Sequence, residues 1–289
     1  MLVARTIPPP IRAGQHVLHF ENRTLVLGVL NVTPDSFSDG GRYASAADAV
    51  AAGVRLWEEG ADILDVGGES TRPGAEEIPE TVELQRVVPV VEALAGRGIP
   101  VSVDTRHAPV AAAALKAGAG LINDVTALTH DPAMVDVAGS SGAAVILMHM
   151  RGAPRSMQQG SLHYDDVVEE VTTYLEGRVE RLVGQGLTRE QLLIDPGMGF
   201  GKGVADNVEL MTGMERLTRS GRAVVWGPSR KSTLGHLLGG VPPAARLMGT
   251  VASCVVAVAG GAHVVRVHDV AAVRQALAVA DAGRGAFIA

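Results

Sequence analysis

The sequence predicts a closed barrel of eight parallel strands, each followed by a helix, and two observations support this prediction. Short apolar runs of strand length occur at residues 25–30, 62–66, 100–103, 120–122, 143–148, 191–194, 223–226 and 262–267. They are rich in β-branched residues and nearly free of polar ones, which is typical of parallel strands buried on both faces. Amphipathic stretches separate them, and eight strand–helix units in about 260 residues match a (β/α)8 barrel.

The amphipathic stretches are predicted to be helices because their apolar residues recur with the 3.6-residue helical period. In chain order the clearest stripes contain Ala49, Val50, Val54 and Trp57, then Leu84, Val87, Val91 and Leu94, then Val167, Val171, Leu175, Val179 and Leu182, and last Val270, Val273, Leu277 and Ala280. The third stripe begins with acidic residues and is followed by Gly184 and Gly186, as expected of a helix with a defined start and end. Residues 251–259 form a further helix of small residues.

Two other organisations are possible alternatives to the barrel. The length of 289 residues would allow two domains of about 150 residues each. A doubly wound open sheet would place a Gly-x-Gly-x-x-Gly turn after its first strand, whereas the first run leads here into NVTPD at residues 31–35. Because no linker or repeat divides the chain, we predict one domain over residues 1–289, with residues 16–20 and 21–24 as a short hairpin that closes the barrel bottom.

The composition excludes several classes of function. A net charge of −6 and an aromatic content of 3% argue against a nucleic-acid-binding surface, which needs a basic face or stacked rings. The single cysteine, Cys254, can form neither an internal disulfide nor a zinc ribbon, and we expect it to be buried. No apolar run reaches the ~18 residues of a membrane-spanning helix. The sequence therefore predicts a soluble, cytoplasmic protein without nucleic-acid or membrane partners.

Polar residues gather where the predicted strands end. Active sites of such barrels are built from the strand ends and the loops that follow them, so these residues are the first candidates for chemistry. Each run is followed by at least one hydrogen-bonding residue, among them Asn31, Glu69, Asp104, Asn123, His149, Asp195, Lys231 and His268. Most of the loops are rich in glycine, which allows the backbone to approach a ligand closely.

Each polar residue also has a structural interpretation. An aspartate at a strand–helix junction often caps the helix, and this alternative stays open for Asp104 and Asp195. We interpret Asp65 and Asp124 as structural. Residues 196–203 lack the first glycine of a P-loop, residues 227–231 lack the second glycine of a nucleophile elbow, and His149 has no partner at a zinc-binding spacing.

The remaining candidates form two groups at the predicted barrel mouth. The first supplies donors and acceptors from different strands: Asp104, Asn123, Asp195 and Lys231. It suits a flat heterocycle with an amidine edge, because a carboxylate can accept two parallel N–H groups. The second is cationic: Arg72, Arg266 and His268. It suits a phosphate, with Mg²⁺ bound by the neutral oxygen of Asn31.

Eight motifs resemble those of the dihydropteroate synthases and occur in the same order. They are NVTPDSFSDGG at residues 31–41, DVGGESTRPG at 65–74, SVDT at 102–105, NDV at 123–125, LMHM at 147–150, DPGMGFGK at 195–202, SRKS at 229–232 and RVHD at 266–269. The resemblance covers about residues 25–282. It implies a (β/α)8 barrel that binds a pterin and belongs to folate biosynthesis.

The resemblance implies a reaction and a set of binding residues. These enzymes join 6-hydroxymethyl-7,8-dihydropterin diphosphate to para-aminobenzoate, which gives 7,8-dihydropteroate and pyrophosphate. The residues implied for the pterin are Asp104, Asn123, Met148, Asp195, Phe200 and Lys231. Those implied for the diphosphate are Asn31, Thr71, Arg266 and His268, with Mg²⁺ on Asn31. Those implied for the aminobenzoate are Phe37, Arg72, Pro73 and Ser232.

The resemblance also implies how the reaction proceeds. Departure of diphosphate leaves a carbocation-like species, and the implied catalytic residues are Asp39, Lys231, Arg266 and His268. The loops at residues 32–41 and 67–74 are expected to be mobile without ligand and to close over the site, and the protein is expected to form a homodimer through the helix at 251–259. Two alternatives are a methyltetrahydrofolate-type methyltransferase barrel and a pterin-binding protein without catalysis.

Overall fold

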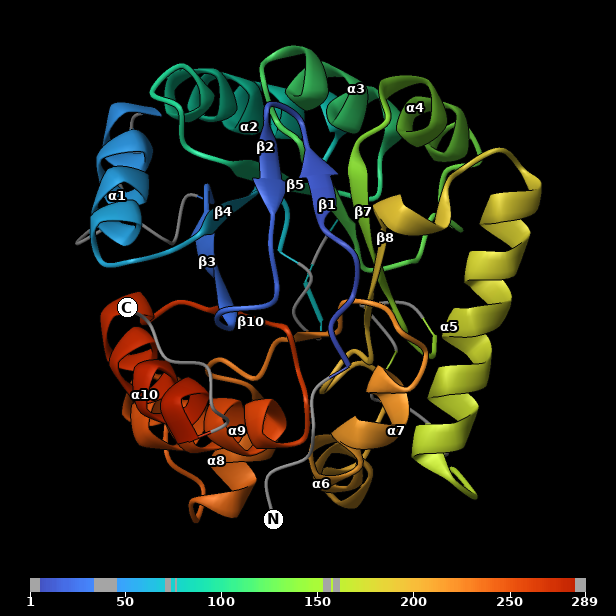
Figure 1. The fold of residues 1–289 in the computed structure, drawn as a ribbon. Coiled ribbons are helices and arrows are strands. Elements are labelled where there is room, and N and C mark those ends of the chain that lie inside the picture. Colours follow the sequence, from blue (N-terminus) through green and yellow to red (C-terminus); the bar gives the residue numbers. More distant parts are fainter. Residues whose placement is uncertain are drawn as a thin grey trace.

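Eight parallel strands form the barrel that the sequence predicts (Figure 1). They are β3 (Leu25–Asn31), β4 (Ile63–Gly67), β5 (Val101–Asp104), β6 (Leu121–Asp124), β7 (Ala144–Met148), β8 (Leu192–Asp195), β9 (Val225–Trp226) and β10 (Val264–Val267). Their order in the sheet is β8-β7-β6-β5-β4-β3-β10-β9. A parallel bridge between Ile194 and Val224, with a 3.0 Å bond from the Ile194 amide to the Ala223 carbonyl, joins β8 to β9 and closes the barrel.

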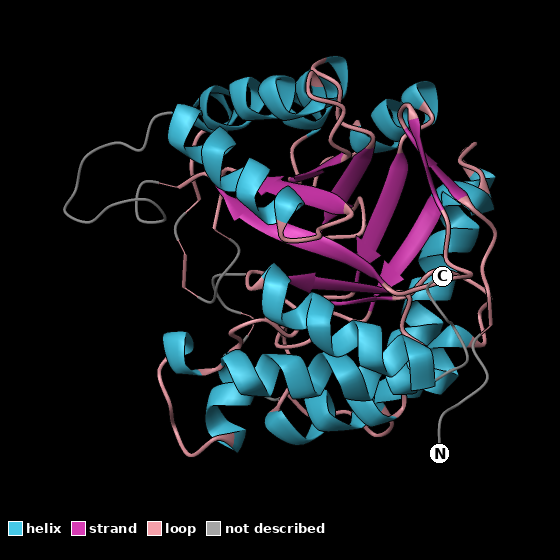
Figure 2. Ribbon diagram, turned by 60° about the vertical axis from the view of Figure 1, so that its left-hand side comes forward, coloured by secondary structure: helices cyan, strands magenta, loops and turns pink. Residues whose placement is uncertain are grey.

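The computed structural model describes residues 6–33, 46–70, 74–75, 77–152, 157 and 162–283. Helices cover the outside of the barrel (Figure 2). They are α1 (Ala46–Glu58), α2 (Glu80–Ala95), α3 (Ala108–Lys116), α4 (Met134–Ser141), α5 (Val167–Gly184), α6 (Val204–Thr212), α7 (Met214–Thr218), α8 (Ser232–Leu237), α9 (Leu247–Ala259) and α10 (Val270–Gly283). All four predicted apolar stripes are confirmed as helices, and none of the described helices is long and apolar enough to cross a membrane.

The alternation of side chains along the strands divides the core into two layers. The layer between the strands and the helices contains Val26, Val66, Val103 and Ile122, together with the buried stripes of the helices. Cys254 of α9 lies in this layer and is fully buried, as predicted. The layer inside the barrel is made of Leu25, Leu27, Ile63, Leu121, Ala144, Ile146, Leu193, Ala223, Val225 and Val264, with apolar residues of the N-terminal segment.

Every second residue of a strand points into the barrel, and toward the carboxyl ends of the strands these inward-facing residues become polar. Two positions beyond inner Ile63, Leu121, Leu193 and Val264 come, respectively, Asp65, Asn123, Asp195 and Arg266. Because parallel strands end at the same face of the barrel, these side chains converge at its carboxyl-terminal mouth. The pattern that fills the lower barrel with apolar groups therefore builds a polar floor at the mouth.

The predicted hairpin at the barrel bottom exists, but its bounds were wrong. The two strands are β1 (Ile11–Ala13) and β2 (His16–Leu18), paired antiparallel through a two-residue turn in which Gly14 has a φ of +64°. A glycine at such a position suits a tight hairpin turn, and residues 21–24 lead instead into β3. Ile11, Ala13 and Leu18 join the inner layer of the barrel, so the hairpin plugs the end opposite the mouth.

Candidate active site

An arginine at the centre of the mouth connects three strands. Arg266 of β10 donates from Nε to Oδ2 of Asp65 at 2.6 Å and from Nη2 to Oδ2 of Asp104 at 2.5 Å. Asn123 of β6 donates from Nδ2 to the same oxygen of Asp65 at 2.9 Å. Burial alone would lower the pKa of Arg266, but the charges of Asp65 and Asp104 outweigh burial and raise it. The guanidinium is therefore permanently charged and fixed in orientation.

Asp104 and Asp195 are part of the polar floor and do not cap helices. The residues that precede α3 and α6 as N-caps are His107 and Gly203, so neither aspartate has the capping role that stayed open for it. Burial raises the pKa of the Asp104 carboxyl, with Arg266 opposing the effect. Burial likewise raises the pKa of Asp195, and the Lys231 ammonium opposes it.

The Asp195 carboxylate keeps capacity for a ligand. Its Oδ1 accepts the Gly197 amide at 2.7 Å, and a carboxylate offers about four acceptor positions in all. Gly197 has a φ of +68°, and a Cβ there would lie 2.0 Å from the His149 carbonyl oxygen, so only glycine allows this turn. The turn fixes the Asp195 carboxylate at the end of β8, where it can accept two adjacent N–H groups of a heterocycle.

Lys231 completes the polar ring from the N-terminal side of α8. Its Nζ donates to the Met198 carbonyl at 2.6 Å and lies 4.7 Å from the centre of the Phe200 ring. Burial lowers the pKa of Lys231 to about 8. A Cβ at Gly227 would lie 3.8 Å from both Lys231 Nζ and Asp195 Oδ2, so the glycine leaves the space between these two groups open.

Apolar side chains form one wall beside the polar floor. Met148 and Phe200 pack in a small buried cluster with Val125 and Met157, separate from the two main core layers. Met148 is 4% and Phe200 9% exposed, so both are almost withdrawn from water next to Asp195 and Lys231. A flat ring that binds the polar groups through its edge would lie against this wall with its faces.

A second group of residues links the ends of β3, β9 and β10. Asn31 Nδ2 lies 3.5 Å from Nε2 of His268, whose Nδ1 and backbone amide lie 2.9 and 3.2 Å from Oγ of Ser229. Ser229 therefore helps to fix the orientation of the His268 ring. Asn31, Arg266 and His268 thus occupy neighbouring strand ends, as the sequence predicted for an anion site. Ser232 is the exposed first residue of the short helix α8.

Lys202 and His149 form a buried pair beneath the turn that carries Phe200. Lys202 Nζ lies 2.9 Å from His149 Nδ1 and donates to the carbonyl oxygens of Gly197 and Phe200, both at 3.0 Å. Burial lowers the pKa of His149 to about 3 and that of Lys202 well below its ordinary value. His149 therefore serves as an acceptor for the lysine, which holds the turn in place.

Several predicted site residues belong to parts of the chain that the structure does not describe, whereas the two aspartates interpreted as structural are both placed. Thr71, Arg72 and Pro73, together with Phe37 and Asp39, lie outside the described residues, as do residues 34–41 of the first predicted mobile loop. Asp124 is structural, as expected, because its carboxylate accepts from the Thr126 amide and hydroxyl and the Leu128 amide. Asp65, likewise interpreted as structural, accepts from both Arg266 and Asn123 of the polar floor. Its place two residues beyond inner Ile63 was the available signal.

The geometry agrees with comparisons to known proteins. A model of the pterin binding enzyme family matches residues 27–268. A dihydropteroate synthase of Synechocystis sp. is 43% identical over 276 residues, which is 95% of each chain. The dihydropteroate synthase of Xanthomonas albilineans, solved with 4-aminobenzoic acid, has a TM-score of 0.89 at 46% identity and covers 96% of this chain and 98% of its own. The same enzyme solved with 7,8-dihydropteroate has a TM-score of 0.85 at 44% identity, with coverages of 96% and 99%. The polar mouth on this barrel and its likeness to these proteins together show that the chain belongs to the family of pterin-binding enzymes.

Proposed function

We propose that this protein is a dihydropteroate synthase, which joins 6-hydroxymethyl-7,8-dihydropterin diphosphate to para-aminobenzoate and releases pyrophosphate. The observation that carries the proposal is the polar floor, where buried Asp104, Asn123 and Asp195 meet Arg266 and Lys231 next to an apolar wall. A relative that is 44% identical has been solved with 7,8-dihydropteroate. A methyltransferase barrel or a silent pterin-binding protein would share the floor, but the relatives that match over nearly the whole chain are synthases.

The pterin binds through its edge in this proposal. Asp195 accepts the N–H groups of the 2-amino group and N3, Asn123 and Asp104 bind other edge nitrogens, and Lys231 donates to the ring carbonyl. Met148 and Phe200 contact the faces of the ring. Charge-assisted hydrogen bonds of this kind are about twice as strong as neutral ones, and burial at the mouth strengthens them further.

The diphosphate lies beside the pterin, over Asn31, Arg266 and His268, with Thr71 as a further contact. Arg266 uses two of its five N–H groups on Asp65 and Asp104, which leaves three for phosphate oxygens. Asn31 directs its Nδ2 toward His268, and its carbonyl oxygen is the kind of ligand that Mg²⁺ takes alongside phosphate oxygens and water. When bound there, the ion would neutralise charge on the departing diphosphate.

The reaction proceeds by substitution at the pterin methylene. The bond from this carbon to the diphosphate oxygen breaks, and the electron pair leaves with pyrophosphate while Arg266 and His268 bind the developing charge. The electron-rich dihydropterin ring stabilises the carbocation-like methylene, and the proposed role of Asp39 is to supply a negative charge when its loop closes. The amino nitrogen of para-aminobenzoate then forms the new C–N bond and loses a proton. Phe37, Arg72 and Pro73 contact this second substrate, and Ser232 binds its carboxylate.

We also propose that the protein is a cytoplasmic homodimer. Exposed apolar side chains on neighbouring helices support the dimer: Met248 and Val256 of α9 are 72% and 40% exposed, and Leu237 of α8 is 53% exposed. Apolar surface of this kind is commonly covered by a partner. Sedimentation of the purified protein at several concentrations tests this assembly, and a monomer at all concentrations would contradict it.

A pyrophosphate-release assay with both substrates tests the activity. We expect pyrophosphate and dihydropteroate in equal amounts, and neither product when para-aminobenzoate is left out. Methyl transfer from a methyl-tetrahydrofolate in place of this reaction would support the methyltransferase alternative. Pterin binding by calorimetry without turnover would support the silent protein. Omission of Mg²⁺ in the presence of a chelator is expected to lower the rate, and an unchanged rate would remove the ion from the proposal.

His268→Ala is expected to weaken binding of the pterin diphosphate about 10-fold or more while it changes binding of the bare hydroxymethyl pterin less than two-fold. The reason is its place beside Asn31, away from the floor that holds the ring. Calorimetry with both ligands measures the difference, and exposed His19 at the far end of the barrel gives a matched control variant. Equal losses for both ligands would show that His268 acts on the ring or on folding. Arg266→Ala is less selective, because it also leaves Asp65 and Asp104 without their cation.

Pterin affinity is expected to fall as the pH rises through about 8, because burial sets the pKa of Lys231 there and its ammonium form binds the ring carbonyl. Calorimetric titrations with a hydroxymethyl pterin from about pH 6 to about pH 10 measure the effect. Lys231→Met should abolish this part of the pH dependence, and any titration of the ligand itself remains in the variant. A loss of affinity in the wild type that persists unchanged in the Lys231→Met variant would contradict the assignment.

Folding stability changes with pH in the opposite direction. Between about pH 8 and pH 10.5 the Lys231 side chain binds fewer protons in the folded protein than in the unfolded chain, so its contribution to stability rises with pH in that window.

A further inference from the structure

The buried side-chain amide of Asn207 joins two elements of the candidate site. Asn207 belongs to α6 and is 1% exposed. Its Oδ1 accepts from the Gly199 amide at 2.7 Å, in the turn that follows β8. Its Nδ2 donates to Oγ1 of Thr233 in α8 at 3.1 Å and to the Gly203 carbonyl oxygen at 2.6 Å. One side chain thus connects the turn after β8 with the first turn of α8.

Both of these elements contribute to the site. In the turn, the Met198 carbonyl accepts from Lys231 Nζ at 2.6 Å, and a Cβ at Gly199 would lie 3.5 Å from Lys231 Cδ. Lys231 is also the residue that precedes α8 as its N-cap, and Thr233 follows Ser232 directly as the second residue of this helix. The bond from α6 to α8 therefore ends next to Ser232.

The contact between Asn207 and Thr233 is shielded from water. The two residues are 1% and 3% exposed, so water cannot replace either partner if the other is removed. Helix α8 has only six residues, and a helix of this length depends on packing and side-chain contacts for its stability. Loss of the bond to Asn207 should therefore loosen the start of α8.

The turn after β8 has a second anchor that does not involve α8. Lys202 Nζ donates to the Phe200 carbonyl oxygen at 3.0 Å and lies 2.9 Å from Nδ1 of His149, just beyond the end of β7. This pair holds the turn, with Phe200 on it, against the end of β7. The Phe200 wall should therefore stay in place when the start of α8 is loosened.

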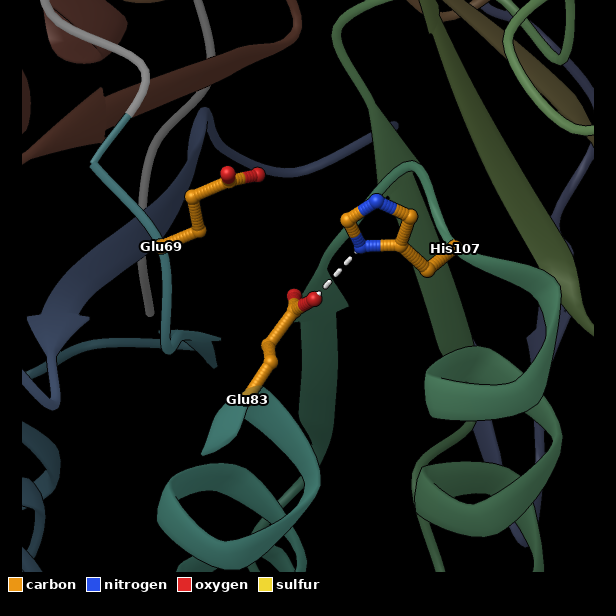
Figure 3. A group of neighbouring side chains, drawn as sticks. All are labelled: Glu69, Glu83 and His107. Atoms are coloured by element: carbon orange, nitrogen blue, oxygen red, sulfur yellow. Dashed lines mark hydrogen bonds and ion pairs between the residues drawn. The ribbon is translucent and has the colours of Figure 1, made fainter. Parts of the chain in front are cut away.

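The turn after β5, which follows Asp104, is likewise held by its own contacts. Nδ1 of His107 lies 2.7 Å from Oε2 of Glu83 in α2, and Figure 3 shows this pair beside Glu69. Arg106 in the same turn pairs with Glu69 at 3.2 Å, and the side chains of these two residues are 7% and 8% exposed. The part of the polar floor on β5 is thus anchored to α2 and to the end of β4, not to α8.

We propose that Asn207, through Thr233, is a positioning residue for the second substrate: it fixes Ser232 at the start of α8 relative to the turn that carries Phe200. The inference rests on the proposed function, which places the pterin ring against Phe200 and the carboxylate of para-aminobenzoate on Ser232. The amino nitrogen of this substrate must reach the pterin methylene while its carboxylate is bound. The position of Ser232 relative to the ring therefore determines how well the second substrate fits.

Steady-state kinetics and calorimetry of Thr233→Val test the proposal. Valine keeps the branched shape of threonine and removes the hydroxyl that accepts from Asn207. The KM for para-aminobenzoate is expected to rise roughly 3- to 10-fold, the range for one lost hydrogen bond, while the affinity for a hydroxymethyl pterin stays within about two-fold. Thr233→Ser keeps the hydroxyl, so it should return the KM to about that of the wild type.

Thr218→Val is the matched control for the loss of a buried hydroxyl. Thr218 of α7 is 4% exposed, and its hydroxyl donates to the Glu215 carbonyl oxygen at 2.9 Å within the same helix. This variant should lose stability without a change in the KM for para-aminobenzoate or in pterin affinity. Asn207→Ala removes the contact from its other end. It should raise the KM at least as much as Thr233→Val, and the two effects should be less than additive when combined.

Three outcomes would overturn the proposal. The first is an unchanged KM for para-aminobenzoate in the folded Thr233→Val and Asn207→Ala variants. The second is an equal loss of pterin affinity in Thr233→Val, because α8 would then act on the ring through Lys231. The third is a KM that stays raised in Thr233→Ser, because the hydroxyl would then not be responsible. Failure of the wild-type protein to form dihydropteroate would instead refute the proposed function.

Discussion

Replacing Asp195 with asparagine is expected to weaken pterin binding by about 10- to 150-fold, which corresponds to a loss of about 1.5–3 kcal/mol. The carboxylate is 5% exposed and stands at the end of β8 with its Oδ1 on the Gly197 amide. An amide has one acceptor oxygen, so it cannot accept two N–H groups of the pterin side by side, and its NH2 group would face one of them. The substitution therefore replaces an attractive contact with a repulsive one.

Calorimetry with a hydroxymethyl pterin measures this loss directly. Asp136→Asn, at an exposed position in the first turn of α4, controls for the general effect of removing one negative charge. Thermal unfolding of the Asp195 variant should change little or even move upward, because burial disfavours the charged carboxylate that the substitution removes. Wild-type affinity in the variant would exclude Asp195 from the pterin site.

The barrel could be predicted from the sequence because its signals are local. Apolar runs and helical stripes each occupy one short stretch of chain, and their alternation allows few architectures. The closing hairpin was harder to place, because strands of three residues carry almost no periodic pattern. Gly14 marks its turn in the sequence, but the predicted hairpin at residues 16–24 lies several residues too far along the chain.

The sequence predicts which strand ends carry the candidate site residues, but not which side chains contact one another. Asp104, Asn123, Asp195 and Arg266 converge because strand ends in a parallel barrel must do so. Lys202 and His149 are 53 residues apart, and their contact depends on how two loops pack. It cannot be inferred from their spacing in the sequence. The same is true of Arg106, whose partners Glu69 and Glu77 belong to a different strand–helix unit.

Asp65 shows how a residue interpreted as structural can also orient residues of the candidate site. It is fully buried, and its Oδ2 accepts from both Arg266 and Asn123. One carboxylate oxygen thus helps to fix the orientation of both the Arg266 guanidinium and the Asn123 amide. Both Asp65 and Asp124 lie within strand-end motifs, and the sequence separates them only by the face of the strand, since Asp65 comes two residues after inner Ile63 and Asp124 comes three after inner Leu121.

Asp65→Asn is expected to lower the free energy of unfolding by about 3–5 kcal/mol, the range for breaking a buried ion pair, and to weaken pterin binding as well. Arg266 would keep only Asp104 as an ionic partner, and the introduced amide oxygen, which can still accept from both Arg266 and Asn123, would hold them less firmly because it carries no full negative charge. Denaturant unfolding and calorimetry on the folded fraction measure the two effects separately.

Asp281→Asn is the matched control. Asp281 of α10 is also a buried carboxylate with two hydrogen bonds, to the amide and hydroxyl of Thr24, and it lies near the amino-terminal end of β3. Both variants should lose stability, but only Asp65→Asn should lose pterin affinity, because only Asp65 orients groups that face the ligand. If the folded Asp65 variant bound the pterin as tightly as the Asp281 variant, Asp65 would be structural after all, and Arg266 and Asn123 would hold their positions without it.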